Sequence, residues 1–122
     1  MFEIMVRTRF AAAHQLNLTG RKCENLHGHN WKIEVFVKGE HLDHAGVVYD
    51  FGLLKKNVNA IMDELDHKFL NDLPELFPEG SPSSEHIAVY IANRLKAQLP
   101  EGITVSRVNA WESDDSCATY IP

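Results

Sequence analysis

The order in which strand-like and helix-like hydrophobic patterns follow one another is the feature that most limits how this chain can fold. Apolar residues alternate with polar ones over residues 2–13 and again over 31–38, which predicts two strands. Two apolar stripes with helical spacing predict two helices. The first follows Asp50, a plausible N-cap, and consists of Phe51, Leu54, Val58, Ile61, Met62 and Leu65. The second follows the N-cap candidates Ser81, Ser83 and Ser84 and consists of Ile87, Tyr90, Ile91, Leu95 and Leu99. Segments 103–111 and 118–121 return to strand character, and the first of them slips in parity, as at a β-bulge.

This order of strand, strand, helix, helix, strand, strand argues against alternating βαβ units. It predicts an α+β fold, in which a four-stranded antiparallel sheet carries both helices on one face. The 122 residues fit a single domain that spans residues 1–122. A four-stranded sheet has two open edges, so assembly of subunits edge to edge would be one way to cover them.

The overall charge argues against a nucleic-acid partner. Acidic residues outnumber basic ones by 17 to 12, and the longest basic cluster, Arg21-Lys22, is too short to follow a polyanion. We therefore expect no nucleic-acid partner.

The sequence also lacks the patterns of membrane and secreted proteins. It shows no apolar run near the roughly 20 residues that span a bilayer and no secretory pattern at its start. We therefore expect a cytoplasmic protein with no membrane partner, in which Cys23 and Cys117 are reduced.

Three of the seven histidines are spaced in a way that suggests a metal site. His27 and His29 flank Gly28 just before the second strand, and alternate residues of an extended chain point to the same side. His14 ends the first strand, so an antiparallel hairpin would bring it opposite the other two. Three imidazoles leave one tetrahedral position open, as in catalytic zinc sites. The His-x-His pair by itself also occurs as two surface histidines, and it is the third histidine that favours a metal.

Other polar residues have more than one interpretation. Cys23 stands four residues before His27 and could be a fourth zinc ligand, a nucleophile or a general base. Asp66 and His67, which follow the first helix, could form a carboxylate–imidazole pair, or His67 could simply favour the helix end. Glu112, at the end of the third strand, could be solvated or could accept two adjacent N–H groups of a pterin or purine edge.

Taken together, six segments in the same order resemble the 6-pyruvoyl-tetrahydropterin synthase family. They cover almost the whole chain and are FAAAH, CENLHGHNW, VVYDFGLLK, LDHKFLND, SPSSEHIA and WESDDSCATY. The short length and the Cys-x-x-x-His-Gly-His spacing are most similar to the bacterial 6-carboxy-5,6,7,8-tetrahydropterin synthase branch, which acts in queuosine (7-deazaguanine) biosynthesis.

The resemblance implies a tunnelling fold (T-fold) that assembles into a homohexamer, a dimer of trimers with active sites between subunits. It also implies a role for each matching residue. Zinc would be held by His14, His27 and His29. Cys23 would be the catalytic thiol, and Asp66 and His67 its proton-relay partners from a neighbouring subunit. Binding of the pterin would fall to Glu112, Ser84 and Glu85.

The implied activity is that of a lyase acting on a small-molecule pterin triphosphate. The enzyme would convert 7,8-dihydroneopterin triphosphate to 6-carboxy-5,6,7,8-tetrahydropterin and release acetaldehyde and triphosphate. Two alternatives stay open. One is 6-pyruvoyl-tetrahydropterin synthase, which eliminates triphosphate without loss of the side chain, and the other is a non-catalytic module that binds zinc or a pterin.

Overall fold

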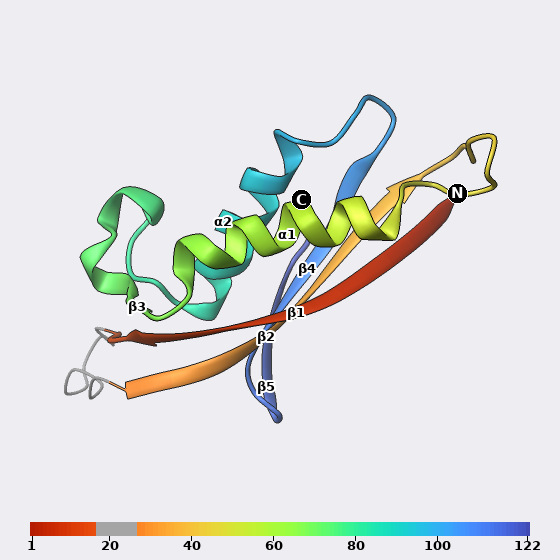
Figure 1. Cartoon of the computed structure of the whole chain (residues 1–122). Helices are drawn as coiled ribbons and strands as arrows, with labels where there is room; N and C mark the ends of the chain where they lie inside the picture. Colours follow the sequence, from red (N-terminus) through yellow and green to blue (C-terminus); the bar gives the residue numbers. More distant parts are fainter. Residues whose placement is uncertain (17–26) are drawn as a thin grey trace.

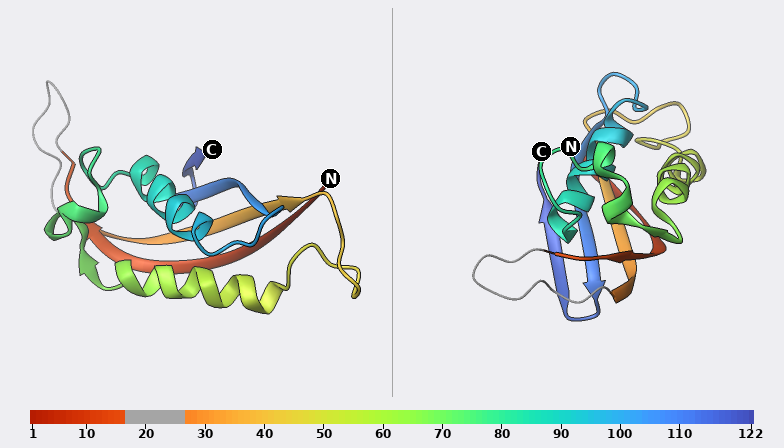
Figure 2. Two further views of the ribbon diagram at one scale, coloured as in Figure 1. Left: turned by 90° about the horizontal axis from the view of Figure 1, so that it is seen from above. Right: turned by 90° about the vertical axis from the view of Figure 1, so that its left-hand side faces the viewer.

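The computed structural model describes residues 1–16 and 27–122 of the chain. Its long strands form one sheet, and both long helices lie on the same face of that sheet (Figures 1 and 2). This is the α+β architecture that the hydrophobic patterns predict. None of the helices in these ranges has the length and apolar character needed to cross a bilayer.

Four antiparallel strands make up most of the sheet, in agreement with the prediction. β1 (Phe2–His14) pairs with β2 (His27–Gly39), β2 pairs with β4 (Thr104–Ser113), and β4 pairs with β5 (Ser116–Tyr120). A fifth strand, β3 (Lys68–Phe69), adds only two residues and runs parallel to β1, so the strand order is β3-β1-β2-β4-β5. So short a strand has no periodicity of its own, and the sequence did not predict it.

Two capped helices connect β2 to β4. α1 (Phe51–Leu65) begins after Asp50, whose side chain accepts a hydrogen bond from the N–H of Leu53, and α2 (Ser84–Lys96) begins after Ser83, whose hydroxyl accepts one from the N–H of His86. Both caps were among the predicted candidates. Between the helices the chain passes through β3 and two short 3₁₀ turns, η1 (Leu70–Asp72) and η2 (Pro74–Leu76).

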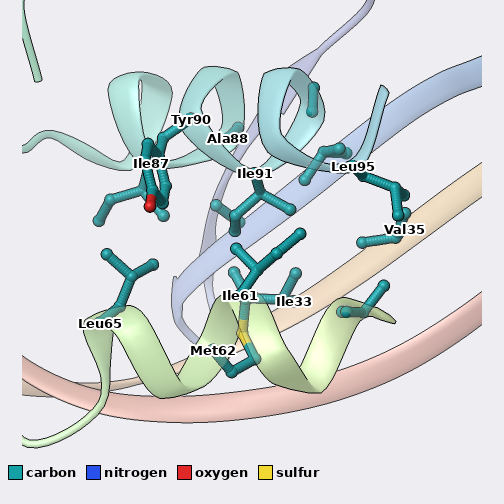
Figure 3. Close-up of a cluster of buried hydrophobic side chains, with 14 of the residues drawn as sticks. Ile33, Val35, Ile61, Met62, Leu65, Ile87, Ala88, Tyr90, Ile91 and Leu95 are labelled. Carbon is teal, nitrogen blue, oxygen red and sulfur yellow. The ribbon is translucent and has the colours of Figure 1, made fainter. Parts of the chain in front are cut away.

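The hydrophobic core fills the space between the helices and the sheet, as Figure 3 shows. Alternate residues of β2, among them Ile33 and Val35, are fully buried and face the helices. The predicted stripes supply the other side, through Ile61, Met62 and Leu65 of α1 and Ile87, Ile91 and Leu95 of α2. Two members of the predicted stripes behave differently. Phe51, in the first turn of α1, is exposed, and Leu99 lies beyond the end of α2 and is only partly buried.

A β-bulge in β4 decides which of its residues face the helices. Phe36 pairs with Arg107 whereas Val37 pairs with Val105, so Ser106 is an extra residue on β4. Both Val105 and Val108 are consequently buried despite their odd spacing. This is the slip in parity that the sequence showed, and beyond it Val108, Ala110 and Glu112 share the helix-covered face.

Candidate metal centre

Three adjacent strands bring two imidazoles and one carboxylate together under the start of α2. His14 ends β1, His29 lies near the start of β2, and Glu112 lies near the end of β4. One ligand atom from each of the three lies within 4.8 Å of the others. The Oε1 atom of Glu112 is 2.9 Å from Nε2 of His29 and 3.1 Å from Nε2 of His14. This arrangement could hold a metal ion, and no other group of three such residues was found among the described residues.

The orientation of His14 favours a cation at this point. Its side chain is fully buried, and its Nδ1 atom is 2.9 Å from the carbonyl oxygen of Pro82. A carbonyl only accepts hydrogen bonds, so Nδ1 carries the hydrogen and donates it. In a neutral ring, Nε2 then directs a lone pair at the Glu112 carboxylate, which is also an acceptor. Two acceptors 3.1 Å apart need a proton or a metal ion between them, and an imidazole whose other nitrogen is hydrogen-bonded in this way is a common metal ligand.

Trp31 packs against the imidazole rings of both His14 and His29. Its indole meets His14 and His29 edge-on, with ring centroids 4.9 and 5.1 Å away. The indole is itself stacked on Phe10 at 5.2 Å and donates its N–H to the hydroxyl of Ser84 at 3.2 Å. Because Trp31 is fully buried and closely packed, it restricts the movement of the two imidazoles.

The backbone of His27 pairs with His14 in the antiparallel register, as the hairpin argument predicted. Cys23 lies outside the described residues, and so do Arg21 and Lys22.

Asp66 and His67 form the carboxylate–imidazole pair that one interpretation of the sequence anticipated. Nδ1 of His67 is 2.8 Å from Oδ2 of Asp66, and the second carboxylate oxygen accepts the N–H of Ala11 at 2.8 Å. The bond from Ala11 is the main cause that lowers the pKa of Asp66, and the bond from His67 adds to it. His67 has φ 59°, a left-handed conformation that is unusual for a residue with a side chain. The chain adopts it where α1 ends and β3 begins.

The same pair lies at the histidine end of the sheet. A hollow of about 450 Å³ is lined by His67 and His29, together with neighbouring residues of β1, β2 and β3. His67 is largely exposed there, so its imidazole is accessible to a ligand or to another chain.

The three residues predicted to bind a pterin border a second hollow. It measures about 160 Å³ and is lined by Ser84, Glu85, Glu112, Ser116, Cys117 and Ala118. A larger hollow of about 600 Å³ lies between the end of α2 and the C-terminal tail, but this smaller one includes a residue of the histidine cluster. Glu112 thus borders both the candidate metal centre and the candidate pocket.

The contact of Glu112 with the histidines was not anticipated from the sequence, which assigned it to the pterin alone. One signal was present: Glu112 continues the parity of Val108 and Ala110, which face the core. The bulge at Ser106 hides that parity in the first half of the strand.

The chain is similar to known proteins along almost its whole length. Residues 3–122 match the family model for 6-pyruvoyl tetrahydropterin synthase. A dihydroneopterin monophosphate aldolase of Pyrococcus furiosus is 37% identical over 112 residues, which is 92% of this chain and 90% of the relative. A 6-carboxy-5,6,7,8-tetrahydropterin synthase of Haemophilus influenzae is 34% identical over 142 residues, covering 98% and 99%. The human 6-pyruvoyl tetrahydrobiopterin synthase is 36% identical over 133 residues, covering 97% and 90%.

A solved structure extends the agreement to the fold. The 6-pyruvoyl tetrahydropterin synthase of Caenorhabditis elegans superposes with a TM-score of 0.83 at 28% identity, over 99% of this chain and 95% of that one. The predicted T-fold is therefore confirmed. On the family match, the relatives and the shared fold, the chain belongs to the 6-pyruvoyl tetrahydropterin synthase family.

Proposed function

We propose that this protein is a zinc-dependent lyase that converts 7,8-dihydroneopterin triphosphate to 6-carboxy-5,6,7,8-tetrahydropterin, with release of acetaldehyde and triphosphate. The observation that carries the proposal is the convergence of His14, His29 and Glu112 beside a hollow lined by Ser84 and Glu85. Membership of a family of tetrahydropterin synthases supports a pterin substrate.

The residues around the centre fit zinc. Neutral imidazoles and a carboxylate are common zinc ligands, and His14 is oriented by Pro82 as such ligands usually are. We propose that His14, His27 and His29 hold the ion. When bound, zinc supplies a Lewis acid that polarises oxygens of the substrate side chain.

Proton transfer is assigned to Cys23 and to the Asp66–His67 pair. The lowered pKa of Asp66 keeps its carboxylate ionised, so it accepts the Nδ1 hydrogen of His67 and leaves Nε2 as the basic nitrogen. Nε2 can then take up or return a proton at the substrate side chain. The role of Cys23 as the thiolate base rests on its position in the motif.

The pterin ring is assigned to the hollow beside the start of α2. The carboxylate of Glu112 would accept two adjacent N–H groups of the ring, with Ser84 and Glu85 as further contacts. Such a contact would hold the side chain of the substrate at a fixed place relative to the metal centre.

We also propose that the protein acts as a homohexamer, a dimer of trimers, in the cytoplasm. β3 pairs with β1 only at Ala12 and Ala13, which leaves most of the edge of β1 uncovered by any described strand. Such an edge favours pairing with a strand of another subunit. A neighbouring subunit would then bring its own Asp66 and His67 to the pocket.

The relatives provide two alternative activities. The human relative is named as a 6-pyruvoyl synthase, which would retain the side chain, and the P. furiosus relative as an aldolase on dihydroneopterin monophosphate, which would cleave it. Queuosine biosynthesis as the pathway depends on the carboxy-type product and is part of the proposal.

One incubation separates these activities. The zinc-loaded protein would be mixed with 7,8-dihydroneopterin triphosphate, and separately with the monophosphate, and the pterin products would be identified by mass. We expect 6-carboxytetrahydropterin with an equimolar amount of acetaldehyde from the triphosphate. A 6-pyruvoyl product, or cleavage of the monophosphate alone, would replace the proposed reaction with one of the alternatives. Absence of turnover on both substrates would contradict an enzymatic role.

A further inference from the structure

We infer that the face of the sheet opposite the helices carries a binding site for a phosphate-class oxyanion, built on Arg9 of β1 and Lys32 of β2. The site is separate from the candidate metal centre. Asn30, which borders it, lies between His29 and the buried Trp31, and successive residues of a strand point to opposite faces. The inference therefore goes beyond the proposed function and does not depend on it.

Two positive side chains stand side by side on this face. Arg9 and Lys32 are direct cross-strand partners in the pairing of β1 with β2. Like charges directly opposite each other destabilise a sheet, so an anion that contacts both side chains would stabilise it. Neither side chain has an ion pair or a hydrogen bond with any residue that the structure describes. The other described arginines each have a glutamate partner, and they are Arg7, Arg94 and Arg107.

The carboxylate beside this pair has no capacity left for it. Glu34 lies two residues from Lys32 on β2, and its Oε2 atom accepts two N–H groups of Arg7. Its Oε1 atom accepts the indole N–H of Trp111 and the amide N–H of Asn109. A carboxylate has about four lone-pair sites, so these four bonds occupy them all. The charges of Lys32 and of its partner on β1 are therefore left for an anion from outside the chain.

A hollow of about 260 Å³ lies at the two cations. Its lining consists of Arg9, Asn30, Lys32, Trp111, Ser113 and Asp114. A guanidinium can donate two parallel hydrogen bonds to two oxygens of a phosphate group, and an ammonium adds a point charge. The Asn30 amide and the Ser113 hydroxyl are further donors, since the Ser113 oxygen already accepts the N–H of Asp115 and its hydrogen is left to donate.

Asp114 is the acidic residue of this lining, and it opposes an anion. Its single negative charge faces the two positive charges of Arg9 and Lys32, so the lining as a whole favours an anion over a cation. Its carboxylate has no ion pair with either of them in the described part of the chain. Removal of this charge should therefore strengthen anion binding, which allows a test that does not depend on the loss of a function.

Calorimetric titration with inorganic phosphate at low ionic strength tests the site. The proteins are the zinc-loaded wild type, Arg9→Gln, Lys32→Gln and Lys38→Gln. We expect Arg9→Gln and Lys32→Gln each to weaken phosphate binding by at least about tenfold, because hydrogen bonds between charged groups are typically worth this much. Lys38→Gln removes the same charge from an exposed position of β2 outside the hollow and should bind as the wild type does.

Two results of this titration would overturn the inference. One is the absence of phosphate binding to the wild type. The other is equal affinity in all four proteins, which would place the phosphate elsewhere, for example on the zinc ion.

Asp114→Asn provides the second measurement and remains informative even where a lysine or arginine variant fails to fold. It should bind phosphate about three- to fivefold more tightly than the wild type, the effect of one unit charge a few ångströms away in a water-like medium. Asp115→Asn removes a charge from the same turn but outside the lining, and its effect should be smaller. An unchanged affinity in Asp114→Asn would show that phosphate does not occupy this hollow.

A phosphate group can reach the site as a free ion or as part of an organic molecule. Titration with ribose 5-phosphate distinguishes these sources. Binding no tighter than that of inorganic phosphate would identify the free ion as the ligand, and tighter binding that is lost in Arg9→Gln would identify an organic phosphate. Both results support the site, whereas tighter binding that persists in Arg9→Gln and Lys32→Gln would contradict it.

Discussion

Trp111 donates its indole N–H to Oε1 of Glu34 at 2.7 Å, on the face of the sheet that the helices do not cover. The next residue, Glu112, lies where the pairing of β4 with β5 shifts between Trp111 and Ser113, and its carboxylate contacts His14 and His29 on the opposite face. Glu34 therefore stabilises, from behind the sheet, the strand that presents the carboxylate of the candidate metal centre.

The carboxylate of Glu34 connects three strands, β1, β2 and β4. Besides Trp111 it accepts the side-chain N–H of Asn109 at 3.1 Å and two N–H groups of Arg7 at 2.8 and 3.1 Å. Partial burial opposes ionisation, but the hydrogen bonds from Trp111, Arg7 and Asn109 outweigh it and lower the pKa of Glu34. The carboxylate is thus charged at neutral pH and bonded at both oxygens.

Replacement of Glu34 by alanine should destabilise the protein. The change leaves the donors of Trp111, Asn109 and Arg7 without their acceptor in a largely buried place, which costs about 1–3 kcal/mol for groups of this kind. The measurement is the free energy of unfolding in urea. Glu3→Ala is the matched control, because Glu3 also bonds to two side chains but is exposed, and its loss should cost less than about 1 kcal/mol. Equal losses for the two variants would contradict the central role of Glu34.

A second prediction concerns the left-handed conformation of His67. A residue with a Cβ pays a steric cost of roughly 1–2 kcal/mol for φ near 59°, whereas glycine has no Cβ and does not. Part of the gain is offset because glycine loses more chain entropy on folding. His67→Gly should therefore be more stable than His67→Ala by about 0.5–1 kcal/mol in chemical unfolding.

Both His67 variants should lose turnover, because each removes the imidazole that accepts or returns protons. If His67→Gly is more stable than His67→Ala and neither variant turns over substrate, the strained backbone at this position is retained for the imidazole that it presents. Two results would contradict this interpretation: identical stability of the glycine and alanine variants, or full turnover by either.

Much of the architecture could be predicted because the spacing of apolar residues indicates strands and helices and because capping residues indicate where helices begin. The alternation through Trp31, Ile33 and Val35 identified β2 and its buried face, and Asp50 and Ser83 marked the starts of the helices. These signals are local, and each depends on a period or a cap that a short window of sequence contains.

The features that could not be predicted depend on partners distant in sequence. β3 exists because the backbone after α1 meets β1, with His67 donating its N–H to Ala11, and two residues show no period. Phe51 is exposed although it continues the apolar stripe of α1, which the helix pattern alone does not indicate. Glu112 contacts the histidines because of the register of β4, which depends on the bulge at Ser106 and on the bond from Trp111 to Glu34. The parity slip indicated the bulge, but the bond to Glu34 joins residues 77 positions apart and leaves no local pattern.

A third prediction concerns alkaline pH and the contact between the two helices. The hydroxyl of Tyr90 donates to Glu64 at 2.6 Å, and Glu64 also receives two N–H groups of Arg94. Burial, followed by the neighbouring Glu64 carboxylate, raises the pKa of Tyr90 to about 12. Since tyrosine in an unfolded chain titrates near about 10, the protonated hydroxyl contributes stability that is complete below pH 10 and is lost as the pH rises through 12.

The difference in unfolding free energy between the wild type and Tyr90→Phe isolates this contribution. It should favour the wild type at neutral pH and shrink between about pH 10 and pH 12, while the phenolate absorbance of Tyr90 rises over the same interval. A difference that stays constant across this interval would show that the hydroxyl titrates alike in the folded and unfolded chains.

The last prediction concerns removal of the metal, and it tests the candidate centre through stability alone. An ion that binds only the folded chain stabilises it by about 2.7 kcal/mol at a free concentration one hundred times its dissociation constant. Stripping the protein with a chelator should therefore lower its Tm, and adding zinc back should restore it. His29→Ala should abolish the zinc-dependent rise in Tm because it removes one of the nitrogens that meet Glu112. The matched control is His44→Ala, which removes an exposed histidine from the loop between β2 and α1 and should keep the full rise. A rise that survives in His29→Ala as well as in His44→Ala would mean that zinc stabilises the protein from a place other than the junction of β1, β2 and β4.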